Sequence, residues 1–112
     1  SLTYSTKIFK ALSEEPRVRI LNLLNHHGEM CISDIEQILD YTQTKTSRHM
    51  SYLKNAGIVG FRKSDQWIFY YIMDEVQGLL GQIWNYIEKD HKYFFSSHFI
   101  SFLYIFSRGL KA

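Results

Sequence analysis

The chain has 112 residues, of which 46% are hydrophobic and 16% aromatic, so it can bury one core and is not a disordered tail. Its formal net charge is +2, and its single cysteine, Cys31, excludes an intramolecular disulfide and a zinc site built from cysteine pairs. This cysteine usage, and the lack of a signal-type apolar stretch in "SLTYSTKIFK", predict a cytosolic or nuclear protein rather than a secreted one, and a cytoplasmic location is expected.

Two helices are expected in the first quarter of the chain. Ser13-Glu14-Glu15-Pro16 is typical of a helix start, with Ser13 as the N-cap and Pro16 in the first turn. Gly28 is expected to end this second helix. The apolar residues at helical spacing are Ile8, Phe9 and Leu12 for the first helix and Val18, Leu21 and Leu24 for the second.

A short third helix and a polar fourth helix follow. Ser33 and Glu36 have the spacing of a capping box, which predicts that the third helix begins at Ser33. Thr42 can cap the fourth helix, and Gly57 can end it. The predicted buried faces are Ile35, Ile38 and Leu39 in the third helix and Thr46, Met50 and Leu53 in the fourth.

Beyond Gly57 the apolar period changes to that of strands. Residues 58–62 and 67–73 are rich in aromatic and β-branched side chains and flank four polar residues, which predicts a β-hairpin. The helical period returns at Asp74, in a last helix whose apolar stripe exceeds the needs of a small core and therefore suggests a second subunit. That stripe consists of Val76, Leu79, Leu80, Ile83 and Ile87.

Residues 41–64 form a basic window. They contain five of the 13 basic residues and none of the 11 acidic ones, so the mild net charge hides a polarised chain. Taken alone, such a face is more often merely solvated. The order of a capped short helix, a basic helix and a hairpin instead predicts a mainly α fold with a small β-hairpin, a winged helix-turn-helix whose fourth helix enters the DNA major groove.

The candidate DNA-binding residues lie on the basic helix and at the root of the hairpin. Gln43 and Arg48 are expected to read bases or clamp phosphates, Lys45 to bind phosphate and His49 to donate to phosphate. The hairpin tip carries Asp65 and Gln66, so its root must supply the positive charge. The full set is Gln43, Thr44, Lys45, Ser47, Arg48, His49, Arg62 and Lys63.

Four segments resemble the ArsR/SmtB family of bacterial metalloregulators and their non-metal relatives, over about residues 8–88. They are "KALSEEPRVRILNLL", "EMCISDI", "QTKTSRHMSYLKNAGIV" and "WIFYYIMDE", of which the third is the most specific. The resemblance implies a homodimer joined through its first and last helices. It also implies a repressor that binds an imperfect inverted repeat in double-stranded DNA and is released by an inducer.

The residues depart from the family's thiolate metal site. Metal sensors of the family carry Cys-x-Cys in the third helix, whereas here Cys31 is followed two residues later by Ser33, which is not a soft-metal ligand. Cys31 therefore has two readings, a buried small hydrophobe or a sensing thiol.

The family's other metal site is on the last helix. Asp74 matches its first ligand, but Val76 and Ile87 occupy the positions of the imidazoles, so no family metal site and no cofactor is expected. A relocated site built from Asp90, His91 and His98 stays open.

The aromatic C-terminal segment exceeds what a dimerisation helix needs. Residues 1–92 are predicted to form the winged helix-turn-helix domain with its dimerisation helices, and residues 93–112 an aromatic helical extension of it. At 14 apolar residues, 93–106 is too short to span a membrane, which needs about 20. The extension is expected either to enlarge the dimer interface or to line a pocket for an apolar effector.

The sequence also bears on two other functional classes. No phosphate-cradling glycine loop, nucleophile elbow or HExxH spacing occurs, so an enzyme is not expected. A winged helix that binds a protein partner, without sequence-specific DNA binding, is the alternative to a DNA-binding regulator.

Overall fold

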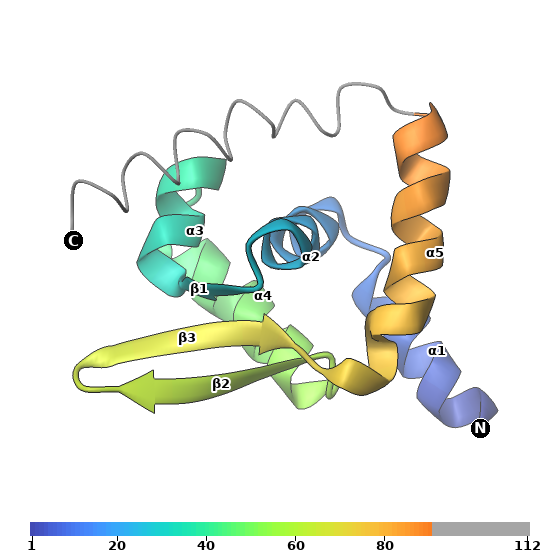
Figure 1. Cartoon of the computed structure of the whole chain (residues 1–112), viewed down its shortest axis with the longest axis horizontal. Coiled ribbons are helices and arrows are strands. Elements are labelled where there is room, and N and C mark those ends of the chain that lie inside the picture. The colour runs from blue at the N-terminus through green and yellow to red at the C-terminus, as the bar shows by residue number, and fades with distance from the viewer. Residues whose placement is uncertain (91–112) are drawn as a thin grey trace. The chain divides into compact units, whose positions relative to one another are not determined.

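The computed structural model describes the backbone of residues 1–90 and the side chains of residues 1–87. The chain divides into two units, Ser1–Met73 and Asp74–Ala112, which are described one at a time. Figure 1 shows the elements. They are α1 (Leu2–Ala11), α2 (Glu15–His27), β1 (Glu29–Cys31), α3 (Ile32–Leu39), α4 (Gln43–Asn55), β2 (Val59–Ser64), β3 (Trp67–Ile72) and α5 (Asp74–Asp90).

The second helix begins later than its sequence pattern predicts. Glu14 is its N-cap and makes no side-chain cap bond, while Pro16 stands in the first turn as expected. The Ser13 hydroxyl donates to the Lys10 carbonyl at 2.6 Å, because Ser13 belongs to the turn that ends α1. The predicted Ser13 cap is therefore wrong, whereas Gly28, with φ of 81°, ends α2 as predicted.

The predicted capping box at Ser33 is also wrong. The third helix begins at Ile32, and its N-cap is Cys31, which makes no side-chain cap bond. The reason is β1, a strand that the sequence pattern did not indicate and that leads directly into α3. Asp40, with φ of 56°, ends α3 in the left-handed region, where Asp is tolerated.

The fourth helix follows its sequence pattern. The Thr42 hydroxyl accepts a bond from the Lys45 backbone N–H, so the predicted cap is confirmed. Thr46, Met50 and Leu53 are buried as expected. The core of the first unit is completed by fully buried apolar side chains, among them Ile20, Leu21, Leu24, Met30, Ile35 and Ile58.

The strands form an antiparallel sheet in the order β1-β3-β2. The predicted hairpin is confirmed: Ser64 pairs with Trp67, so its turn has only the two residues Asp65 and Gln66, and Asp65 has φ of 55°. The sequence pattern did not indicate β1, the remaining strand of the sheet. It has only three residues, and an alternation of apolar and polar side chains cannot be recognised over that length. Glu29 pairs with Tyr71 and so joins β1 to the β2–β3 hairpin, which is the wing of the fold (Figure 1).

The second unit contains α5. Asp74 and Glu75 stand in its first turn, where carboxylates are favourable to the helix dipole. Of the predicted stripe, Val76 and Leu80 are buried, whereas Leu79 is exposed. The aromatic segment 93–112 lies outside the described residues, and within the described part no helix is long and apolar enough to cross a membrane.

Candidate nucleic-acid interface

The first turns of α4 present exposed polar side chains. Its hydrophobic positions fix it against the core, and the Thr42 cap fixes its start. Of the predicted DNA-binding residues on it, Gln43, Thr44 and Arg48 are exposed, and Lys45 and Ser47 are half-buried. The whole helix contains no Asp or Glu. The positive end of its dipole and its cations therefore act in the same direction on an anion.

Lys45 is held by an aromatic ring. Its Nζ lies 3.9 Å from the centroid of the Tyr41 ring, just before the helix begins. A cation over a ring face is attracted by the ring quadrupole. The contact restricts the ammonium group to the N-terminal end of α4.

His49 does not belong to the exposed set. Its side chain is only 2% exposed, so the prediction that it donates to phosphate is wrong. Nδ1 lies 3.5 Å from Nη1 of Arg17, and Nε2 lies 3.4 Å from Nη2 of Arg48. Burial, followed by Arg48 and Arg17, lowers the pKa of His49 below its usual 6.5. The imidazole is therefore neutral at physiological pH and can accept a hydrogen bond from an arginine.

Arg17 is a buried arginine that links three helices, and it was missed at the level of the sequence. It is 5% exposed. Its Nε donates to the Ala11 carbonyl at 2.7 Å, Nη2 donates to the Lys10 carbonyl at 3.0 Å, and Nη1 pairs with Glu14. Its guanidinium also lies 4.0 Å from the centroid of the Tyr52 ring on α4. The sequence did contain one signal: Arg17 lies three, four and seven residues before Ile20, Leu21 and Leu24, and therefore on the buried face of the same helix.

The Arg17 contacts explain why a charge is tolerated in this position. A buried guanidinium is costly unless its donors are satisfied. Here the end of α1, the start of α2 and the inner side of α4 all contribute partners. Arg17 thereby fixes the packing of the recognition helix against the rest of the first unit.

The basic charge at the wing is partly neutralised. Nε and Nη2 of Arg62 donate to the Glu29 carboxylate at 2.7 to 2.9 Å, and the guanidinium lies 4.7 Å from the centroid of the Phe69 ring. Glu29 is on β1, outside the basic window of residues 41–64. The positive charge that was expected from the root of the hairpin is therefore partly neutralised at Arg62, whereas Lys63 is exposed on the same strand.

The single thiol is buried, and the described side chains form no metal site. Cys31 is buried in β1, opposite Phe69. Among the residues that the structure describes, no three His, Cys, Asp or Glu side chains gather as a metal site would require. The candidate set of Asp90, His91 and His98 lies outside the described side chains.

Comparisons with known proteins agree with this geometry. The family model "Bacterial regulatory protein, arsR family" matches residues 14–60. A transcriptional regulator of the HTH type from Methanocaldococcus jannaschii is 44% identical over 71 residues, which cover 63% of this chain and 80% of that protein. The arsenical resistance operon repressor of Bacillus subtilis is 35% identical over 75 residues, covering 66% of this chain and 71% of the relative.

Another relative is longer than the matched region. A homologue of the cadmium resistance transcriptional regulatory protein CadC from Staphylococcus aureus is 39% identical over 69 residues, which are 62% of this chain. The chain spans only 57% of that relative's length.

A solved structure has the same fold. It is the homodimeric winged helix-turn-helix domain of Mb0332 from Mycobacterium bovis, a possible ArsR-family regulator, with a TM-score of 0.68 and 27% identity. The match covers 80% of this chain and 82% of that one. The wing, the capped α4 and the matched relatives lead to one conclusion: this chain belongs to the arsR family of bacterial regulatory proteins, which are winged helix-turn-helix transcriptional regulators.

Proposed function

We propose that the chain is a homodimeric, sequence-specific repressor that acts in the cytoplasm, binds an imperfect inverted repeat and leaves it when an inducer binds. The observation that carries this proposal is the exposed, acid-free start of α4, where Gln43, Thr44 and Arg48 face solvent on a helix whose opposite side is buried. Side chains of these types reach base edges and phosphates from a helix in the major groove.

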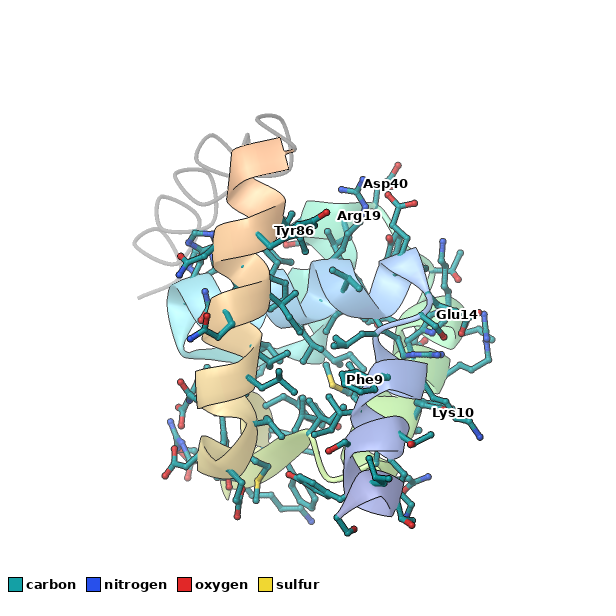
Figure 2. The ribbon with its side chains drawn as sticks, turned by 90° about the vertical axis from the view of Figure 1, so that its right-hand side faces the viewer. Phe9, Lys10, Glu14, Arg19, Asp40 and Tyr86 are labelled. Atoms are coloured by element: carbon teal, nitrogen blue, oxygen red, sulfur yellow. The ribbon has the colours of Figure 1, made fainter. Side chains whose placement is uncertain are left out.

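Exposed apolar side chains support the dimer. On α1, Leu2 and Phe9 are largely exposed and Tyr4 is partly exposed, and Tyr86 is exposed on α5 (Figure 2 labels Phe9 and Tyr86). Large apolar groups exposed along a helix are typical of a surface that another subunit covers. A two-fold dimer would place two copies of α4 about one DNA turn apart, roughly 34 Å, which requires an inverted repeat.

The inducer is proposed to be something other than the metals of the family's usual sites. Cys31 is buried and its neighbour at the second thiolate position is Ser33. Val76 and Ile87 replace the imidazoles of the other site, and neither can bind a metal ion.

The test is fluorescence anisotropy on the DNA upstream of the gene, at two salt concentrations, with an unrelated duplex as control. Tight, selective binding that weakens steeply with salt is expected. Replacing Arg48 by Ala should lower affinity by about 1–3 kcal/mol, roughly 5- to 150-fold, without unfolding the domain, because Arg48 is exposed. The matched control is Arg19→Ala on α2, where an exposed arginine is already paired with Glu15. Its effect should stay below about twofold.

One observation favours a second candidate, a winged helix that binds a protein. The wing exposes Phe61, Trp67 and Ile68, while its Arg62 is paired with Glu29. Equal, weak binding to both duplexes, with no difference between Arg48→Ala and Arg19→Ala, would contradict the repressor and favour this alternative.

A further inference from the structure

A groove of about 310 Å³ lies in the first unit between α1 and the last turn of α4, and its chemistry suits an anion. Lys7 and Lys10 line it from α1, Tyr52 and Asn55 line it from α4, and Ala56 lines it from the C-cap of that helix. We propose that this groove binds a small organic anion, an aromatic carboxylate, and that its occupancy lowers the affinity of α4 for DNA. The regulatory half of this inference rests on the proposed function.

The lining defines the class of ligand. Two lysines and no acidic residue line the groove. The nearby carboxylate of Glu14 is already paired with Arg17. The lysine stems, the Tyr52 ring and the Ala56 methyl group supply apolar walls for a flat body. The volume is at the lower end of the range for small-molecule sites, which begins at roughly 300 Å³. Figure 2 shows Lys10 extending from α1, well away from Arg19 and Asp40.

A continuous set of contacts joins the groove to the DNA-binding surface. The ring of Tyr52, which lines the groove and is 40% exposed, lies 4.0 Å from the Arg17 guanidinium. Arg17 lies 3.5 Å from Nδ1 of His49, and Arg48 lies 3.4 Å from Nε2. A neutral imidazole has one acceptor nitrogen, whereas both arginines only donate, so His49 accepts from one of them at a time. A ligand that displaces Tyr52 or Arg17 therefore changes how Arg48 is held.

The direction of the effect follows from charge. Asn55 lies seven residues beyond Arg48 on the same helix, a distance of about 10 Å along its axis. An anion held there adds negative charge to the helix that approaches the phosphates. Its binding must therefore be coupled unfavourably to DNA binding, and the coupling is reciprocal.

The anion site is tested without DNA, by isothermal titration calorimetry of the full chain with 2-naphthoate. Inorganic phosphate and the uncharged 2-naphthamide are the comparison probes. We expect one 2-naphthoate per chain, with Lys7→Ala and Lys10→Ala each weakening binding at least fivefold. Arg19→Ala, which makes the same charge change on α2, should leave binding unchanged. No binding, binding of phosphate alone, equal binding of 2-naphthamide, or indifference to both lysines would each overturn the site.

The coupling is tested by anisotropy on operator DNA with and without saturating 2-naphthoate at constant ionic strength. The dissociation constant for DNA should rise about tenfold, within the usual range of allosteric coupling. His49→Leu should still bind 2-naphthoate but respond to it by less than about threefold, and Arg17→Lys serves the same purpose if His49→Leu does not fold. An unchanged constant in the unsubstituted protein would overturn the coupling. Failure to bind DNA at all would contradict the proposed function and this coupling, while calorimetry still decides the anion site.

Discussion

Two buried polar residues, Arg17 and His49, connect the core of the first unit to its exposed recognition surface. Arg17 satisfies its donors on the end of α1 and on Glu14, and the remaining contacts are with α4. His49 lies between Arg17 and the exposed Arg48. The orientation of Arg48, which we propose to bind DNA, thus depends on a buried residue.

The burial of His49 predicts how stability depends on pH. Burial, Arg48, Arg17 and Lys45 lower its pKa, and Glu14 opposes them. Because the folded pKa is below the unfolded value of 6.5, the unfolded chain binds more protons as the pH falls below 6.5. The free energy of unfolding should therefore decrease as the pH is lowered from 7.5 to 5.5.

Urea denaturation at these two pH values measures the effect. His49→Leu should have a smaller pH difference than the unsubstituted protein. Some dependence should remain, because burial and His26 lower the pKa of His27 in the same direction. Equal pH differences in the two proteins would show that His49 titrates normally.

At the level of elements, the start of α4 depends on one hydroxyl group. Thr42 Oγ1 accepts from the Lys45 N–H at 3.2 Å. Thr42→Ala should lower the free energy of unfolding by about 1 kcal/mol, because it leaves that amide without its capping partner. Chemical denaturation measures the loss, and Thr42→Ser, which keeps the hydroxyl, should restore most of it. A Thr42→Ser protein as unstable as Thr42→Ala would mean that the methyl group, not the cap, matters.

The ion pair between Glu29 on β1 and Arg62 on β2 reduces the positive charge of the wing. The hydrogen bonds from Arg62 lower the pKa of Glu29, so the pair is charged at neutral pH. Glu29→Gln releases the Arg62 charge in each subunit, and we expect DNA affinity to rise and the salt dependence of the dimer to steepen by about 1.8 in log–log slope, which is about 0.9 for each wing.

The matched control for the wing is Glu15→Gln, which releases Arg19 in the same way on α2. It should leave the salt dependence unchanged. If Glu29→Gln behaves like Glu15→Gln, Arg62 does not approach the phosphates, and Lys63 alone supplies the charge of the wing.

For the whole molecule, the apolar groups exposed on α1 and α5 predict a dimer. Light scattering after size exclusion should give twice the 13.3 kDa of one chain. Removing residues 93–112 should weaken the dimer if the aromatic segment enlarges its interface. A truncated protein that stays equally dimeric and equally stable would contradict that role and favour the apolar-effector role of the segment.

Much of the fold was predictable from local patterns. The Thr42 cap, the Gly28 stop, the buried face of α4 and the β2–β3 hairpin depend on residues close together in the chain, whose spacing is visible in the sequence. The predicted helix caps at Ser13 and Ser33 were wrong because a neighbouring element changed where the helix begins. A turn ending α1 engaged Ser13, and β1 made Cys31 the N-cap of α3.

The sequence by itself therefore determined the order of the helices and the β2–β3 hairpin, the basic recognition helix and the family, but not the strand β1. Only the tertiary structure decided which cations are available to a ligand. Arg62 pairs with Glu29, which is 33 residues away in the sequence, and Arg17 contacts His49, which is 32 residues away. Such partners are brought together by burial of the core, because packing and the register of β1 on β3, not local spacing, set their distance. The same packing buries His49 and opens the groove beside Tyr52.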